Sequence, residues 1–452
     1  MPQKPCLHFV GIGGAGMSAL AQIHAMDSGP ATGSDRLFDR GGNQALQAKL
    51  AALGIRLFPQ DGSGLTRETE LVVLSTAVED SNPELAAARR LGVPLMHRSE
   101  LLARHVAQSR TIAVTGTSGK STVAAMIFDI LEAAGRSPSV ITGGSLIVLQ
   151  ARGFFGNALR GRSQLLVIEA DESDGSLLNY RPAVGVFLNL TKDHKEVSVM
   201  RDILLKFGAN VQTALVNADD PNLSELRSSR TFGLGSGEVR AEILELTAWG
   251  SRFRIAGEEI VLPLPGRHNV ANAAAAVAAA LNEGVALADC RRALAACRGV
   301  ARRFQSLGRV RGVEVVDDYA HNPAKVAAAL AAAHLRAGRI LAVYQPHGFA
   351  PTKLLRDDLV EAFAAGLGPE DRLWLPDIYY AGGGATKDVS SRDLAQPLRR
   401  RGKNACHVPD RADIVPDIAG QARDGDLVLV MGARDPSLPD FAQDILKALS
   451  AS

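Results

Sequence analysis

Residues 111–122 carry an apolar, β-rich run directly into an Ala-rich helical pattern through a glycine-rich turn. The turn reads Thr115-Gly116-Thr117-Ser118-Gly119-Lys120-Ser121-Thr122. Backbone N–H groups at such a turn, followed by a helix N-terminus, can surround phosphate oxygens. In this motif the lysine, Lys120, reaches the β- and γ-phosphates, and the Ser121 hydroxyl binds Mg²⁺. The segment therefore predicts a βα unit that binds ATP or GTP.

One position departs from the strict P-loop pattern. Val114 stands where that pattern has its first glycine, and Gly116 comes later instead. The alternative interpretation is an ordinary glycine-rich turn between a strand and a helix. Gly-Lys-Ser-Thr directly after a strand favours the phosphate-binding interpretation.

The bulk properties are those of a globular protein without a membrane or nucleic-acid signature. Apolar residues make up 46% of the 452-residue chain, charged residues 22%, and the net charge is only +2. The four cysteines lack metal-binding spacing and suit a reducing compartment. We see no signal peptide and no apolar run of the roughly 20 residues that span a bilayer. We therefore expect a cytoplasmic monomer or homodimer, with no nucleic-acid partner and no membrane insertion.

Strand-like apolar runs alternate with helical patterns along almost the whole chain, which is typical of α/β proteins. Three blocks can be separated, at residues 1–107, 108–297 and 298–452. The length fits about three domains. The expected fold class is therefore α/β with three domains.

A second glycine-rich turn lies near the N-terminus, where Gly11-Ile12-Gly13-Gly14-Ala15-Gly16 follows an apolar strand and precedes a helix. It matches the pattern that binds the pyrophosphate of a dinucleotide, and Asp35 stands where a ribose-binding acid would sit. The same loop can bind a UDP-linked ligand, or it can be structural. Two nucleotide loops in one chain favour an enzyme that uses ATP on a UDP-carried substrate.

Acidic and polar residues follow the apolar runs of the second block. Glu169-Ala170-Asp171-Glu172-Ser173-Asp174 comes directly after one run, and such carboxylates can bind Mg²⁺. The alternative is a solvated acidic loop. His194 follows the next run and could contact a second metal ion or a phosphate, although a lone histidine is as often structural.

Further polar residues stand at the ends of predicted elements. Asn269 and Asn272 lie one turn apart at a helix start, where they could bind a nucleotide or simply cap the helix. Arg303 lies at the junction into the third block and could neutralise a transferring phosphoryl group. Asp318 lies where a strand passes into a helix, a place where ligands gather in open α/β sheets.

Taken in chain order, these motifs resemble those of the Mur ligase family, the ATP-dependent amide ligases of peptidoglycan synthesis. The resemblance covers nearly the whole chain and includes GIGGAGMSA, TGTSGKST, EADESD, NLTKDH, GRHNVANA, GVARRFQ, DDYAHNP and YQPH. It implies an N-terminal Rossmann-like UDP-binding domain (1–107), a central P-loop ATPase domain (108–297) and a C-terminal Rossmann-like domain (298–452).

The resemblance also implies an activity. ATP would phosphorylate the carboxylate of UDP-N-acetylmuramate to an acyl phosphate, and the amine of an amino acid would attack it to form an amide, with ADP and phosphate as products. One alternative is a recycling ligase that attaches the L-Ala-γ-D-Glu-diaminopimelate tripeptide. Another is a catalytically silent, nucleotide-binding regulator. The intact Lys120, Ser121, Glu169 and His194 argue against a silent protein.

Residue by residue, the resemblance assigns three kinds of role. The catalytic residues would be Lys120, His194 and Arg303, and the Mg²⁺ ligands would be Ser121, Glu169 and His194. The ATP-binding residues would be Gly116, Thr117, Gly119, Lys120, Ser121, Thr122, Asn269, Asn272, Arg303 and Asp318. The substrate-binding residues would be Gly13, Gly14, Gly16, Met17, Ser34, Asp35, Ser75, Arg98, His321 and His347.

Some positions depart from the family pattern of the members that use L-alanine. Ser118 and Asn322 replace histidines, and Gly348 and Pro351 replace arginines. An arginine offers a planar fork for a carboxylate or a phosphate, which neither glycine nor proline can supply. The departures therefore predict a non-standard or relaxed choice of acceptor.

Overall fold

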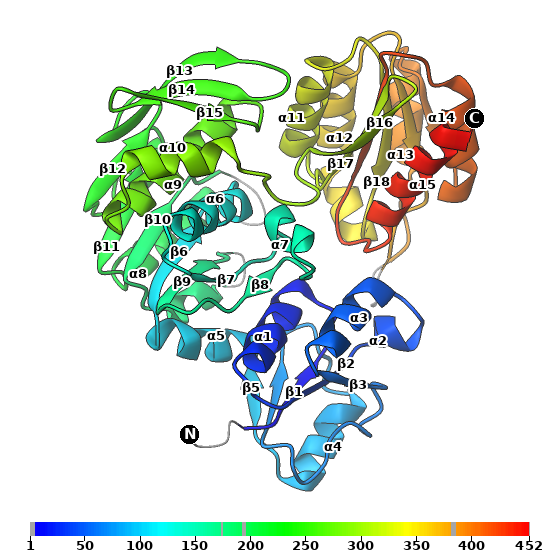
Figure 1. The fold of residues 1–452 in the computed structure, drawn as a ribbon. Helices are drawn as coiled ribbons and strands as arrows, with labels where there is room; N and C mark the ends of the chain where they lie inside the picture. Colours follow the sequence, from blue (N-terminus) through cyan, green and yellow to red (C-terminus); the bar gives the residue numbers. More distant parts are fainter. Residues whose placement is uncertain (1–4, 173–174, 192–195, 381–385, 452) are drawn as a thin grey trace. The chain divides into compact units, whose positions relative to one another are not determined.

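The computed structural model describes residues 5–172, 175–191, 196–380 and 386–451. The chain separates into two compact units (Figure 1). The first runs to Leu246 and resumes from Gly250 to Val300, and the second holds Thr247–Trp249 and everything from Ala301 onward. Strands of the described residues form three sheets, each accompanied by helices, which confirms the α/β class. The limits of the three domains stay a prediction.

The N-terminal sheet belongs to the first unit and is entirely parallel, in the order β3-β2-β1-β4-β5. Its central strand, β1, leads into the first glycine loop. The strands are β1 (Leu7–Val10), β2 (Ala31–Ser34), β3 (Arg56–Phe58), β4 (Leu71–Leu74) and β5 (Leu95–His97). The helices are α1 (Ala15–Met26), α2 (Arg36–Asp39), α3 (Gln44–Ala52), α4 (Pro83–Leu91) and α5 (Arg98–Ala107).

The second sheet of this unit has the order β15-β14-β13-β12-β11-β10-β6-β9-β7-β8 and places β6, the P-loop strand, between β10 and β9. Its strands are β6 (Arg110–Thr115), β7 (Ser139–Ile141), β8 (Ala158–Leu159), β9 (Leu165–Glu169), β10 (Val184–Phe187), β11 (Thr213–Asn217), β12 (Arg230–Gly233), β13 (Val239–Leu246), β14 (Ser251–Ile255) and β15 (Glu258–Leu262). The helical segments are α6 (Lys120–Ala133), α7 (Ile147–Ala151), η1 (Ser176–Asn179), α8 (Val197–Gly208), η2 (Pro221–Leu223), α9 (Arg267–Asn282) and α10 (Leu287–Ala295).

The second unit contains the third sheet, in the order β16-β17-β21-β18-β19-β20, parallel except for β16. Its strands are β16 (Gln305–Val310), β17 (Val313–Asp318), β18 (Ile340–Gln345), β19 (Arg372–Leu375), β20 (Ala405–His407) and β21 (Leu427–Gly432). The helical segments are α11 (Pro323–His334), α12 (Phe349–Gly366), α13 (Arg392–Arg400), η3 (Arg411–Asp413), α14 (Ile414–Gln421) and α15 (Leu438–Ala451). No helix in the described part of the chain is long and apolar enough to cross a bilayer.

The P-loop helix is fixed by one of the most completely buried parts of the molecule. Helix α6 packs against α9, whose residues 273–280 are all buried. The run of alanines in α9 allows this close approach because alanine has a small side chain and a high helix propensity. The N-terminus of α6, and the glycine turn before it, are therefore held on a rigid core.

One carboxyl group interrupts this core, and it predicts a pH-dependent stability. Burial raises the pKa of Asp129 in α6 to about 7, against an ordinary value of 3.8, although a hydrogen bond with Cys297 opposes the shift. The folded state therefore binds a proton that the unfolded state releases between these two pH values. This contribution to stability is complete below pH 3.8 and is lost as pH rises to about 7.

We expect Asp129→Asn to remove this fall in stability between pH 3.8 and about 7. Relative to the variant, the free energy of unfolding of the wild type should fall by up to about 1.4 kcal/mol per pH unit across this interval. Urea unfolding at several pH values measures the difference, with Asp202→Asn, at an exposed position of α8, as the control. Parallel pH profiles of the wild type and Asp129→Asn would contradict the prediction.

Candidate functional site

The glycine turn after β6 has the geometry expected of a phosphate-binding loop. Gly119 has φ +91° and directly precedes α6, which begins at Lys120. A Cβ at residue 119 would lie 2.6 Å from the Oδ1 atom of Asn272. Only glycine combines this left-handed backbone with so close a neighbour. The turn therefore brings the first residue of α6 and Asn272 of α9 to one place, as the sequence predicted for two of its nucleotide-binding residues.

Lys120 is held by a partner that the sequence interpretation did not assign to it. Its Nζ atom lies 2.7 Å from Oε2 of Glu172 and 2.8 Å from the carbonyl oxygen of Gly116. Glu172 is buried, and burial raises the pKa of its carboxyl, an effect that the Lys120 ammonium opposes. The lysine is thus oriented across the mouth of its own loop, where an incoming phosphate would compete with the carboxylate for it.

Ser121 and Glu169, two predicted metal ligands, both contact the turn that follows β7. Glu169 Oε1 accepts a hydrogen bond of 3.1 Å from the backbone N–H of Gly143. A Cβ at Gly144 would lie 3.4 Å from the Ser121 hydroxyl oxygen. We call residues 142–144 the linking turn; the sequence interpretation missed it, although its Gly-Gly pair was a visible signal. His194, the third predicted ligand, lies outside the described residues.

The remaining residues predicted near the P-loop differ in how deeply they are buried and in their hydrogen-bond partners. Thr117 is buried, and its hydroxyl donates to the carbonyl of Thr191 at 3.2 Å, while Thr122 is only partly buried. Asn269 donates to the carbonyl of Pro265 at 2.8 Å and accepts from Asn272 at 3.3 Å. The two asparagines therefore form one polar pair at the start of α9.

The N-terminal glycine loop is tied to the residue after β2. Asp35 accepts hydrogen bonds of 2.8 Å from the N–H of Gly13 through Oδ2 and from the N–H of Leu37 through Oδ1. Gly14 precedes α1 and is exposed. A Cβ at Gly16 would come within 2.9 Å of the Arg98 guanidinium. The structure thus brings the loop, Asp35 and Arg98 together.

Of three other predicted substrate-binding residues, two are directed into the domain and one stands after the end of β4. Ser34 is fully buried, and its hydroxyl donates to Glu84 Oε2 at 2.5 Å, which directs it into the domain rather than toward a ligand. Met17 is buried in the core beneath the loop. Ser75 follows β4, is partly exposed, and accepts from Val78 at 3.0 Å through its carbonyl.

In the second unit, Asp318 anchors the segment that carries Arg303. Its two carboxylate oxygens accept from the backbone N–H groups of Phe304, at 2.6 Å, and Ala320, at 2.7 Å. Burial raises the pKa of Asp318, and the positive charge of Arg303 opposes this. The Arg303 guanidinium lies 5.2 Å from the ring centre of Tyr319. The structure therefore brings Arg303 and Asp318 together.

His321 and His347 lie side by side, with ring centres 5.6 Å apart. Asn322 caps α11 by accepting from Lys325 N–H at 3.0 Å. Gly348 precedes α12, and the Lys353 ammonium pairs with Asp388 at 2.5 Å on the surface. Asn322 and Gly348 thus stand at helix starts, and neither side chain carries a charge.

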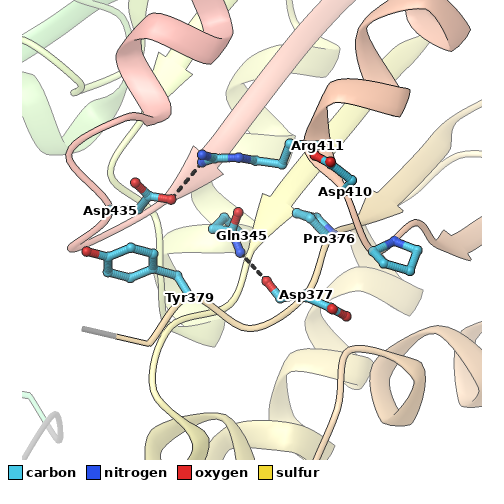
Figure 2. Close-up of a pocket in the computed structure, with 8 residues that line it drawn as sticks. Gln345, Pro376, Asp377, Tyr379, Asp410, Arg411 and Asp435 are labelled. Carbon is cyan, nitrogen blue, oxygen red and sulfur yellow. Dashed lines mark hydrogen bonds and ion pairs between the residues drawn. The ribbon is translucent and has the colours of Figure 1, made fainter. Parts of the chain in front are cut away.

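A cavity of about 400 Å³ lies in the second unit at the carboxyl ends of β18, β19, β20 and β21, the edge where ligands bind in open α/β sheets (Figure 2). Gln345 and Tyr379 line it together with an ion pair between Arg411 and Asp435, whose closest atoms are 2.7 Å apart. The sequence interpretation assigned no site role to these residues, although Gln345 belongs to the YQPH motif.

The groups that the first unit gathers at the P-loop are those that bind ATP and Mg²⁺. A backbone turn at a helix N-terminus, a lysine, a hydroxyl and a carboxylate are the groups that hold a nucleotide triphosphate and a hard cation. The buried Thr115 hydroxyl, at the end of β6, has no hydrogen-bond partner among the described residues. Nor do those residues contain three clustered His, Cys, Asp or Glu side chains that could hold a metal without further ligands. Phosphate oxygens and water would have to complete the coordination.

Comparison with known proteins covers nearly the whole chain. Models of the Mur ligase family match it as the catalytic domain at residues 7–110, the middle domain at 114–280 and the glutamate ligase domain at 302–434. A UDP-N-acetylmuramate–L-alanine ligase from Synechococcus sp. (strain RCC307) is 38% identical, over 95% of this chain and 93% of that protein.

Solved structures show the same similarity. The UDP-N-acetylmuramate–alanine ligase of Thermotoga maritima matches with a TM-score of 0.82 and 27% identity, over 98% of this chain and 99% of that one. A murein peptide ligase from Psychrobacter arcticus matches with a TM-score of 0.72 and 22% identity, over 99% of both chains, which shows a shared fold.

Proposed function

The chain belongs to the Mur ligase family, and from this premise we propose that it joins an amino acid to UDP-N-acetylmuramate at the expense of ATP, in peptidoglycan synthesis. The proposal rests on the arrangement of residues at the end of β6. There Lys120, Ser121 and Asn272 meet at a turn that only glycine can form. The other family members of similar length named above are ligases for the same UDP-linked substrate.

Each group of residues has one task in this proposal. ATP supplies the phosphoryl group that turns an unreactive carboxylate into an acyl phosphate with a good leaving group. The N–H groups of the P-loop and the Lys120 ammonium neutralise the phosphate charge, and Ser121 and Glu169 provide oxygen ligands for Mg²⁺. Because phosphoryl transfer depends mainly on positioning and charge, these residues need only be held in place.

The N-terminal loop would hold the UDP diphosphate. Gly13 and Gly14 lead into α1, whose N-terminal N–H groups and dipole favour an anion. Arg98 lies against the same loop and adds a positive charge. In the second unit, Arg303 would neutralise the transferring phosphoryl group, and His321 and His347 would contact the acceptor.

A murein tripeptide is the second candidate acceptor, and the cavity beside Gln345 favours it because it offers room well beyond a single methyl group. Arg411 and Asp435 would present both charges there to a zwitterionic or peptide ligand. The Gln345 side chain is fixed by donating to the carbonyl of Asp377 at 2.5 Å.

We expect a relaxed choice of acceptor, because Gly348 and Asn322 supply no charge beside His321 and His347. The measurement is ADP formation with ATP, Mg²⁺ and UDP-N-acetylmuramate, giving kcat/KM for L-alanine, glycine, L-serine and the L-Ala-γ-D-Glu-diaminopimelate tripeptide. The three amino acids should lie within about tenfold of each other. A preference for L-alanine over glycine well above the ~10-fold that one methyl group supplies, with an inert tripeptide, would identify an ordinary alanine ligase.

A further inference from the structure

One buried side chain, that of Asn157, hydrogen-bonds the helix that follows the first glycine loop to the central sheet. This residue directly precedes β8 and is 1% exposed. Its Nδ2 donates to the carbonyl of Ala15 at 2.8 Å and to the Ser18 hydroxyl at 3.0 Å. Its Oδ1 accepts from Gln22 Nε2 at 2.8 Å. The side-chain amide of Asn157 therefore makes all these hydrogen bonds to one face of α1, starting in the first turn of the helix.

The backbone of the same residue supports the linking turn at the P-loop. Its carbonyl oxygen accepts from the N–H of Thr142 at 2.9 Å, and the Thr142 hydroxyl donates to the carbonyl of Gly144 at 2.6 Å. As described above, Gly143 donates to Glu169 and Gly144 lies against Ser121. A single residue thus contacts both the start of α1 and the turn that touches the two proposed Mg²⁺ ligands.

This arrangement can transmit displacement because Asn157 and Thr142 are buried and every polar atom of the Asn157 side chain is hydrogen-bonded. Packed interiors are close to incompressible, and a buried amide that loses its partners costs about 1–3 kcal/mol. A shift of the first turn of α1 must therefore either move Asn157 with it or break these hydrogen bonds. If Asn157 moves, its carbonyl moves Thr142, and the linking turn changes its position against Glu169 and Ser121.

We propose that Asn157 is a positioning residue that couples the two nucleotide loops, so that a ligand at the N-terminal loop raises the affinity of the P-loop for Mg²⁺–ATP. The inference rests on the proposed function, which assigns UDP to the first loop and ATP to the second. By linkage the effect is reciprocal, and ATP must raise the affinity for the uridine ligand by the same factor.

Calorimetric titration tests the coupling without turnover. The Kd of a non-hydrolysable ATP analogue with Mg²⁺ is measured in the absence of UDP and at saturating UDP. UDP is used because it lacks the muramate carboxyl group, so that coupling has to pass through the protein. The wild type should show at least a fivefold change in Kd. Asn157→Ala should reduce that change to about twofold or less, while each ligand alone still binds.

Two further variants distinguish coupling between the nucleotide loops from a general loss of contact between α1 and the central sheet. Thr142→Val removes the hydroxyl that donates to the carbonyls of Gly144, at 2.6 Å, and Asn157, at 3.5 Å, while keeping the side-chain shape, and it should also abolish most of the coupling. Arg160→Ala removes an ion pair with Asp27, with closest atoms 2.8 Å apart, at the far end of α1, and it should leave the coupling intact.

The outcomes differ for each failure. The role of Asn157 is overturned if Thr142→Val shows the same UDP-dependent change in Kd as the wild type. It is also overturned if the wild type binds both ligands but its Kd for the ATP analogue does not change with UDP. Loss of coupling in Arg160→Ala to the same degree overturns it too, because any damage to the helix contact would then suffice. Thr142→Val decides the matter if Asn157→Ala does not fold. A wild type that binds neither ligand instead overturns the proposed function, and the coupling with it.

Discussion

Replacing Lys120 with alanine should lower kcat for ligation by about 10³-fold or more, since comparable losses of preorganised charge cost 10²–10³ and the lysine also orders the loop. The Lys120 side chain is only 16% exposed, and its ammonium bridges the Gly116 carbonyl and the Glu172 carboxylate. Its charge is therefore held in place by groups of the protein. The measurement is ADP formation at saturating substrates, together with the melting temperature.

Glu172 provides the matched control. Lys120→Ala leaves the buried Glu172 carboxylate without its partner, which can destabilise the fold by itself. The double variant Lys120→Ala/Glu172→Gln removes that charge and should restore the melting temperature but not the activity. Glu172→Gln alone keeps the lysine and should retain most of kcat. A folded Lys120→Ala variant with near-normal turnover would refute the P-loop assignment.

The features that could be predicted were those determined by residues close together in the sequence. The apolar runs at residues 7–10 and 71–74 form β1 and β4, and α4 has Asn82 as its cap and Pro83 in its first turn. These elements follow from apolar runs, caps and prolines that lie next to one another in the chain. The glycine turn after β6 belongs to the same class.

Features that depend on distant pairing could not be predicted. Ser34 stands at the expected strand end, yet its hydroxyl faces Glu84, a residue 50 positions away. Lys120 meets Glu172 across 52 positions. Strands β7 and β8 are two or three residues long and carry too little pattern to be recognised, so the linking turn between them was missed. In each case the tertiary fold, not spacing, decides which polar groups meet.

The proximity of Asp318 to Arg303 could not be predicted either, although the family resemblance assigns both residues to ATP binding. In the structure Asp318 bonds to the backbone of Phe304 and faces the positive charge of Arg303. Arg302 and Phe304 have φ values of +61° and +48°, which residues other than glycine rarely adopt. Such strained positions cost of order 1–3 kcal/mol each and persist only where neighbours enforce them. Asp318, which bonds to Phe304, and Asp317, which pairs with Arg302 at 3.1 Å, hold the two residues on either side of Arg303.

We therefore expect Asp318→Ala and Arg303→Ala to lower kcat/KM by about 10²-fold each, and the double variant to lose no more than the worse single one. The reason is that Asp318 acts through Arg303, so that once the guanidinium is absent its position no longer matters. Steady-state kinetics with ATP as the varied substrate gives the three values, and melting temperatures check that each variant is folded. Losses that multiply in the double variant, to about 10⁴-fold, would show that Asp318 acts independently of Arg303, by contacting the nucleotide itself.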